Sequence, residues 1–264
     1  AIKQADIGVA MGSGSEVTKQ AAKLVLTDDN FATLVGAVKL GRVVYAKISS
    51  YLTFQLSQLI ALLMLFVVAS VINLNDGVAL TPVMVLMLNF AVAIFAVIVI
   101  VMEPEPPGLM QRPPRDPSEG IAAPANVVRW LIYGGALFVA ALVPLLAGEA
   151  ELSPDEGSPP MTMAFVIVAL GTLTTGLQLR RDPESGLVAP WGRGTRMLLW
   201  PLAFVILSTE LDFLQDWFGT TELTGWEWLA CLGLTAAVMV VVEVDKAIRR
   251  RRDPAVAPAP TVHE

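Results

Sequence analysis

Charged residues are scarce in this sequence, and their absence from long stretches excludes an ordinary soluble domain. Only 16% of the 264 residues are charged, against about 25% in an average soluble protein. No Asp, Glu, Lys or Arg lies between Lys47 and Asp76, or between Asp76 and Glu103, which leaves uncharged runs of 28 and 26 residues. A bilayer core of about 30 Å needs about 20 apolar helical residues. The sequence therefore predicts an integral membrane protein.

Cysteine and histidine are almost absent as well. The single cysteine, Cys231, excludes an intrachain disulfide and fits a small buried residue of an apolar helix. The single histidine, His263, stands in a Pro/Ala-rich tail and is expected to be solvated. The net charge of -6 gives no support to nucleic-acid binding. Residues 1–47 also lack the basic, apolar and small-residue order of a signal peptide, so none is expected.

Four further uncharged stretches bring the number of predicted spans to six. They are residues 130–148, 157–179, 197–209 and 228–242. The last two are short and span only with flanking residues, including Trp200 and Pro201 in one, and Trp226 and Trp228 as an interfacial belt in the other.

The distribution of basic residues supports the same topology. The segment before the first span holds 6 Lys and Arg, the second connection 3, the fourth connection 4 and the tail 5, which accounts for all 18. The three opposite loops hold only acids: Asp76, Glu149, Glu151, Asp155, Glu156, Glu210, Asp212, Asp216, Glu222 and Glu227. By the positive-inside rule, both termini are expected in the cytoplasm.

The first 47 residues predict short alternating elements followed by a long helix. Residues 7–11 and 24–26 suit buried strands, and Ser15 is placed to cap a helix that ends near Ala22. Residues 28–30 (Asp-Asp-Asn) are placed to cap a second helix. No proline interrupts the chain from residue 2 to residue 80, so that helix is expected to run from Phe31 to about Val71, roughly 60 Å at about 1.5 Å per residue.

The Gly-Ser turn at residues 12–15 has two interpretations. It follows a strand and precedes a helix, as a phosphate-binding loop does. It lacks both the Lys-Ser/Thr ending of a P-loop and a G-x-G-x-x-G fingerprint, so a tight strand-to-helix connection is favoured. Two strands and one helix cannot bury a core alone, so further sheet neighbours are expected upstream of Ala1.

The residues just described resemble a known family. Residues 1–35 (AIKQADIGVAMGSGSEVTKQAAKLVLTDDNFATLV) closely resemble the end of the phosphorylation domain of P-type cation-transporting ATPases. Residues 110–117 (MQRPPRDP) resemble the family's loop after its sixth membrane helix, and residues 162–165 (TMAF) the start of its eighth. The resemblance implies a mainly α, multi-pass membrane fold: a six-helix transmembrane bundle, the family's fifth to tenth helices, preceded by a partial α/β remnant of the haloacid-dehalogenase type.

The resemblance divides the chain into four parts. Residues 1–30 are the expected remnant of the phosphorylation domain, and residues 31–51 a stalk helix that continues into the membrane. Residues 52–248 are the six-span transport domain, and residues 249–264 a basic and then Pro/Ala-rich cytoplasmic tail. In the family, the stalk transmits motion of the phosphorylation domain to the ion sites.

The implied activity is ATP hydrolysis through an aspartyl-phosphate, which drives cation transport. That chemistry needs the phosphorylated Asp, a Mg²⁺ ion and a nucleotide-binding domain. This sequence contains no Asp-Lys-Thr-Gly segment, and we interpret Asp6 as structural. We therefore expect no catalytic or cofactor-binding residue and no ATP hydrolysis by this chain alone. Mg-ATP, the lipid bilayer, the transported cation and the upstream part of the pump, with its actuator domain and first four helices, are the expected ligands and partners of the complete protein.

Polar residues at membrane depth are the candidates for an ion path. Asn89, Gln58 and Gln55 are the best of them, with interhelical hydrogen bonding as the alternative for the glutamines. Thr172, Thr174, Thr175 and Gln178 form a further polar cluster. By resemblance, Asn89 matches an ion-coordinating asparagine, whereas Ala93, Leu62 and Thr172 stand where calcium pumps carry acidic or amide ligands. The transported cation and any metal ligands are therefore unknown from the sequence.

The charged groups at the ends of the spans have simpler interpretations. Glu210, Asp212, Glu243, Asp245 and Lys246 are expected to reach interfacial water, with Glu243 and Lys246 as a pair three residues apart. Residues 249–252, four arginines, are expected to anchor to anionic headgroups.

Three functions compete at this point. The leading one is the transport-domain portion of a P-type cation pump in the plasma membrane. The alternatives are a non-catalytic six-span scaffold or pore, and a truncated product without independent function. The retained ADIGVAMG block (residues 5–12) opposes the pore, because a pore has no use for half a phosphorylation domain.

Overall fold

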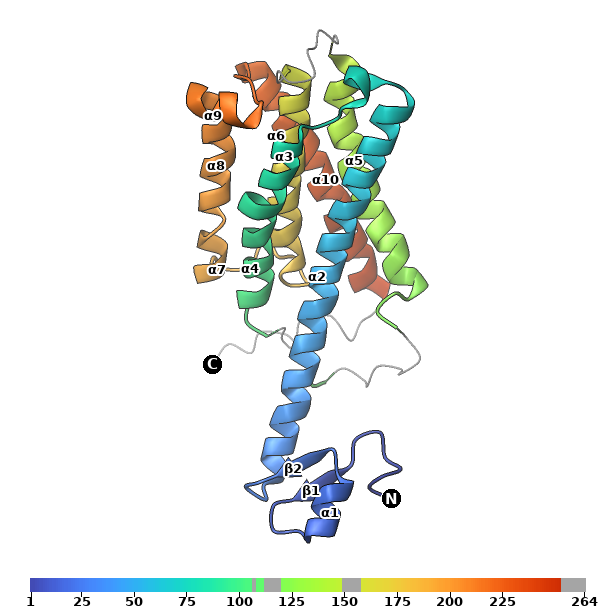
Figure 1. Ribbon diagram of the computed structural model, residues 1–264. Helices are drawn as coiled ribbons and strands as arrows, with labels where there is room; N and C mark the ends of the chain where they lie inside the picture. Colours follow the sequence, from blue (N-terminus) through green and yellow to red (C-terminus); the bar gives the residue numbers. More distant parts are fainter. Residues whose placement is uncertain (106–107, 112–119, 149–157, 253–264) are drawn as a thin grey trace.

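The computed structural model describes residues 1–105, 108–111, 120–148 and 158–252. A bundle of long helices stands on a small α/β unit, and one helix, α2, runs from that unit to the far end of the bundle (Figure 1). The described residues are mainly helical, and several helices are long and apolar enough to cross a bilayer. The chain is therefore a multi-pass helical membrane protein.

The α/β unit contains the predicted elements in the predicted order. Strands β1 (Val9–Met11) and β2 (Leu24–Leu26) are parallel neighbours, joined by helix α1 (Glu16–Ala21). The first strand begins at Val9 and not at Ile7, whose side chain is 66% exposed. Ser15 accepts a hydrogen bond from the Thr18 amide, which confirms the predicted cap.

Glycine is needed at position 12 because two chain segments meet there. The Gly12 amide donates to the Leu26 carbonyl oxygen at 2.7 Å, and a Cβ atom at residue 12 would lie 3.0 Å from that oxygen. This close approach favours the tight connection over a phosphate-binding loop.

Helix α2 (Phe31–Val71) is a single uninterrupted helix of 41 residues, as predicted. The Asn30 side chain caps it by accepting a hydrogen bond from the Ala32 amide at 2.9 Å. Its buried residues all lie between Thr53 and Ala69, so only its distal half packs in the bundle. The expected boundary between the stalk (residues 31–51) and the transport domain (residues 52–248) therefore falls inside a continuous helix, close to where its side chains become buried.

The remaining elements complete the bundle around α6. They are η1 (Leu74–Gly77), α3 (Pro82–Met87), η2 (Leu88–Ala93), α4 (Ile94–Met102), α5 (Pro124–Ala147), α6 (Pro159–Leu179), α7 (Arg193–Arg196), α8 (Leu199–Glu210), α9 (Asp212–Phe218) and α10 (Gly225–Arg252). Helix α6 is the most buried and lies against α5, α4 and α10 (Figure 1). Helix α10 continues to Arg252, so residues 249–252, the basic start of the expected tail, are helical.

Five helical segments, counted over the described residues, pass the test of length and apolarity for a membrane span. They correspond to the predicted first, second, third, fourth and sixth spans. The predicted fifth span differs: α7 and α8 together occupy Arg193–Glu210, and the chain then bends by 95° into α9. The bend follows from Leu211, whose extended backbone (φ -104°, ψ 116°) ends α8.

Candidate functional site

Asn89 lies at a break in the regular hydrogen bonding of the second membrane segment. Residues Leu88–Ala93 (η2) form a π-helical turn between α3 and α4. Such turns are rare and occur often at functional sites. The Asn89 side-chain nitrogen donates to the Val85 carbonyl oxygen at 2.9 Å. The side-chain oxygen, the atom that a cation would need, takes no part in that bond.

Gln58 lies in a different place, at a small polar cavity between α2, α5 and α6. The cavity is lined by Phe54, Ser57, Gln58, Tyr133, Leu137, Thr172 and Thr175. Its volume is about 10 Å³, close to the minimum of about 10–15 Å³ that one water molecule requires. Gln58 is 3% exposed, and among the described residues neither its amide oxygen nor its nitrogen has a partner. The Thr172 hydroxyl is likewise buried and unpaired in this part of the chain.

The three residues expected to line an ion path are therefore not gathered in one pocket. Asn89 and Gln55 do not line the Gln58 cavity, and both are half-buried. The three residues that the resemblance aligns with acidic or amide ligands of calcium pumps are buried: Leu62 is 9% exposed, Ala93 5% and Thr172 1%. Within the described residues, no group of three or more His, Cys, Asp or Glu side chains could hold a metal ion. The membrane interior thus offers amide and hydroxyl oxygens as ligands.

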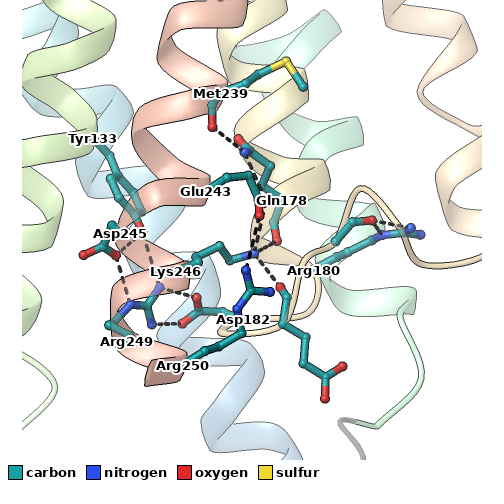
Figure 2. A network of polar contacts seen from close by, with 12 residues as sticks. Tyr133, Gln178, Arg180, Asp182, Met239, Glu243, Asp245, Lys246, Arg249 and Arg250 are labelled. Carbon is teal, nitrogen blue, oxygen red and sulfur yellow. Dashed lines mark hydrogen bonds and ion pairs between the residues drawn. The ribbon is translucent and has the colours of Figure 1, made fainter. Parts of the chain in front are cut away.

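A dense charged network (Figure 2) joins residues of α5, α10 and the connection between α6 and α7, at the end of the bundle nearest the α/β unit (Figure 1). Asp182, in the loop after α6, accepts two hydrogen bonds from Arg249 of α10, at 2.9 and 2.6 Å. Arg129 of α5 lies 3.6 Å from the same carboxylate. Arg249 also donates to Asp245 at 2.9 Å, and the Tyr133 hydroxyl donates to Asp245 at 2.6 Å. The network joins α5, α10 and the α6–α7 loop (residues 180–192).

The electrostatics of this network favour its charged form. Burial alone would raise the pKa of the Asp182 carboxyl, but the hydrogen bonds and charge of Arg249 hold that pKa below its usual value of 3.8, helped by Lys246 and Arg129. Arg249 therefore binds protein carboxylates, and contact of the arginine run with lipid headgroups stays a prediction.

Lys246 corrects a second expectation, because its side chain is fully buried and does not reach interfacial water. Its ammonium group donates to the main-chain oxygens of Gln178, at the end of α6, and of Glu184, in the α6–α7 loop (Figure 2). The expected pair with Glu243 is present but long, at 4.0 Å. Glu243 instead lies 3.3 Å from the side-chain nitrogen of Gln178, which also donates to the Met239 carbonyl oxygen.

Arg180 also binds the α6–α7 loop, through a buried side chain. Its guanidinium group is fully buried and donates to the main-chain oxygens of Gly186 and Ala189, at 2.6 to 3.0 Å. It also contacts Glu103, the residue directly after α4, at 3.4 Å. Burial lowers the pKa of the Arg180 guanidinium and Glu103 opposes that shift, so the group stays charged.

Sequence reasoning counted these cations as markers of one membrane side and missed their partners. One signal was available: a charged residue directly after a long apolar helix must be paired or reach water. The sequence does not show which of the two applies, because the partners of Lys246 and Arg180 are mostly main-chain oxygens of a loop.

Comparison with known proteins identifies the family. The family model described as "Cation transporting ATPase, C-terminus" matches residues 77–248. Calcium-transporting ATPase 1 of Lactococcus lactis subsp. lactis (strain IL1403) is 32% identical over 254 residues, which cover 94% of this chain and 28% of that protein. Calcium-transporting ATPase lmo0841 of Listeria monocytogenes serovar 1/2a (strain ATCC BAA-679 / EGD-e) is 30% identical over 255 residues, which cover 95% of this chain and 28% of the relative.

These matches confirm the resemblance seen in the first 35 residues and in the loops. The chain spans little more than a quarter of the length of either relative. The match to the family model runs from the last residue of η1 into α10 and includes Asn89. The chain belongs to the family of cation-transporting P-type ATPases, as a representative of their C-terminal membrane region.

Proposed function

We propose that this chain forms the stalk and part of the ion pathway of an ATP-driven cation pump. The observation that carries the proposal is the π-helical turn at Asn89, because it places a polar side chain and an irregular backbone at membrane depth. The two relatives named as calcium-transporting ATPases support the same function.

The proposed topology has six spans across the plasma membrane, with both termini in the cytoplasm. Residues Arg193–Glu210 supply the span that the five long segments lack. At the helical rise these 18 residues would cover about 27 Å, close to a bilayer core of about 30 Å. The confinement of all 18 basic residues to one side supports this arrangement.

The proposed pump includes parts that lie outside this chain. The relatives are more than three times as long as the region they share with it. We infer that residues 1–30 complete a haloacid-dehalogenase-like phosphorylation domain, whose other strands would cover the two-stranded sheet. Mg-ATP would bind to that domain and to its nucleotide-binding partner. Helix α2 would then connect the phosphorylation site to the bundle as one rigid element.

Within the membrane, Asn89 is the proposed ligand of the cation, and Gln58 and Gln55 are proposed to line the polar path. A divalent cation in a bilayer needs charge compensation and about 6–8 oxygen ligands if it is calcium. The interior positions 62, 93 and 172 supply none of the charge, since they hold Leu, Ala and Thr. The remaining ligands would come from other parts of the complete pump.

The test uses the complete pump with single substitutions in this region. Asn89→Ala is expected to lower ATP-dependent cation uptake into inverted membrane vesicles by about tenfold or more, because it removes a ligand oxygen from a site where few are available, a loss of about 1.4 kcal/mol or more. Thr174→Ala is the matched control: Thr174 is a half-buried polar residue of α6 whose hydroxyl donates to its own helix, at Leu170 and Gly171.

Uptake by the control should equal that of the unmodified pump. Unchanged uptake in Asn89→Ala would remove Asn89 from the path. Equal loss in both variants would assign the effect to folding, which gel filtration of both proteins checks independently.

A further inference from the structure

Helix α9 (Asp212–Phe218) lies across the end of the bundle and not along it. The chain bends by 95° between α8 and α9, and Figure 1 shows α9 crossing the end of the bundle farthest from the α/β unit. Since α8 runs along the bundle with the spans, a helix at a right angle to it is parallel to the membrane plane. Helix α9 therefore lies at the same depth as the ends of the membrane spans.

The outward side of α9 is aromatic. Phe213 and Trp217, four residues apart, are each 70% exposed and stack on one another with ring centroids 6.1 Å apart. Asp212 and Asp216 precede them by one residue each and are also exposed, so they lie about 100° further around the helix. The helix thus has an aromatic stripe beside an acidic stripe.

The inward side of α9 is fixed to the bundle. Phe218 is 6% exposed and packs edge-on against Phe204 of α8, with centroids 5.5 Å apart. The Gln215 side chain donates to the Thr209 carbonyl oxygen at 2.7 Å, and the Thr81 hydroxyl to the Phe218 carbonyl oxygen at 3.3 Å. The aromatic stripe is therefore held outward by a fixed helix.

We propose that α9 is an interfacial helix, whose Phe213–Trp217 stripe inserts into the boundary between lipid headgroups and acyl chains on the membrane face opposite the α/β unit. Three observations favour lipid as the occupant. Leu207 near the end of α8 and Leu211, the residue between α8 and α9, add exposed apolar side chains, each about half exposed. Trp226, 78% exposed at the start of α10, adds a further aromatic side chain on this face, and tryptophan is the residue enriched at membrane interfaces.

The acidic stripe of α9, Asp212 and Asp216, also fits a helix at the membrane interface. Asp212 and Asp216 would remain in water beside the inserted rings, as the polar face of an interfacial helix does. No Lys or Arg lies in residues 197–245, so attraction to anionic headgroups makes no contribution. The aromatic rings supply the affinity, and α9 would hold the short α8 segment at its depth in the bilayer.

The test uses cysteine labelling, for which this chain is well suited. Its single cysteine, Cys231, is fully buried and is replaced by alanine. Phe213→Cys and Trp217→Cys report on the aromatic stripe, and Asp212→Cys and Asp216→Cys are matched controls one residue away. Each full chain, labelled with a nitrobenzoxadiazole fluorophore, is reconstituted in phosphatidylcholine vesicles. Quenching is measured with a nitroxide at carbon 5 of the acyl chain and with iodide on both sides of the membrane.

Labels at positions 213 and 217 are expected to be quenched about twofold more by the lipid nitroxide than labels at 212 and 216, with the reverse order for iodide. Equal iodide quenching at all four positions would overturn the proposal, and so would protection of 213 and 217 from both quenchers, which would mean that protein covers them. Strongest quenching by a nitroxide near the bilayer centre would overturn it too, since α9 would then span.

A second measurement does not depend on labelling. Trp217→Phe keeps an aromatic ring at the site and is expected to reduce the part of the tryptophan emission that lipid nitroxides quench. An unchanged quenched fraction would contradict the proposal.

Discussion

Removal of Arg180 should strongly disturb the bundle, because its buried side chain binds three main-chain oxygens of the α6–α7 loop. The proposed change is Arg180→Met, which keeps much of the volume and removes the five donors. The guanidinium group donates to main-chain oxygens of Gly186, Ala189 and Pro190 and to the Thr195 hydroxyl. It also contacts Glu103, whose side chain is 6% exposed.

The expected cost follows from what the substitution leaves behind. A hydrogen bond to a charged group contributes about 1.5–3 kcal/mol, and bonds within one cluster do not add. The Arg180 side chain is 0% exposed, so water does not replace the lost donors without opening the loop. The Glu103 carboxylate would keep its ion pair with Arg181 but lose its most deeply buried partner. Breaking a buried ion pair by removing one partner costs about 3–5 kcal/mol, and we expect a loss of stability in that range.

The assay is thermal unfolding of the purified chain in detergent, followed by gel filtration of the surviving fraction. A loss of about 3–5 kcal/mol predicts a Tm lower by about 6–20 °C. Hydrogen exchange should also become faster in the loop from residue 182 to residue 192. Arg193→Met is the matched control, because it makes the same replacement at an exposed position directly after the same loop. This substitution is expected to cost less than about 0.5 kcal/mol.

Equal Tm values for Arg180→Met and Arg193→Met would refute the reasoning. So would a large loss of Tm without faster exchange in the loop, because the loss would then arise elsewhere in the bundle.

Two further predictions concern the α6–α7 loop and the contact between α2 and α5. The pKa of Asp182 is lower in the folded protein than its usual 3.8, so the stability that this carboxylate contributes is complete above about pH 5 and is lost as the pH falls through the folded-state pKa. Between about pH 5 and pH 3, the Tm should therefore fall more steeply for the unmodified chain than for Asp182→Asn. Parallel curves of Tm against pH would contradict this prediction. A Cβ atom at Gly134 would lie 2.6 Å from the Ser57 carbonyl oxygen, so Gly134→Ala should separate α2 from α5 and cost about 1–3 kcal/mol. Gly135→Ala, with nothing within 4 Å, should be neutral or stabilising by about 0.5–1 kcal/mol; similar unfolding curves for the two variants would disprove the close contact.

The sequence predicted the elements that depend on local chemistry. The cap at Asn30, the absence of proline up to residue 80 and the long apolar run together specify α2, and the structure confirms it from Phe31 to Val71. The uncharged runs specify the long spans in the same way, because each bilayer-spanning helix must satisfy its own backbone. The short fifth segment was less well defined, since its end depends on the backbone of a single residue, Leu211.

The contacts of the buried cations were beyond the sequence for a physical reason. Lys246 and Arg180 bind main-chain oxygens, which every residue carries, so no residue type marks the partner. The π-helical turn was hidden as well, because LNFAVA (residues 88–93) has no glycine or proline to indicate irregular backbone. Asn89 was recognisable as a lone polar residue, and the turn around it was not.

These missed features act on one segment. The end of α4 nearest the α/β unit is bound to α2 by Lys47, which donates to the main-chain oxygens of Val101 and Glu103. The same end is bound to the α6–α7 loop through the Glu103 side chain. The other end of α4 meets the π-helical turn, where the regular ladder of hydrogen bonds is interrupted. A displacement of α2 therefore reaches α4 through Lys47, and we expect the segment to yield at the turn, its weakest point. On the proposed function, that motion would change the surroundings of Asn89 while the α6–α7 loop stays fixed by Arg180.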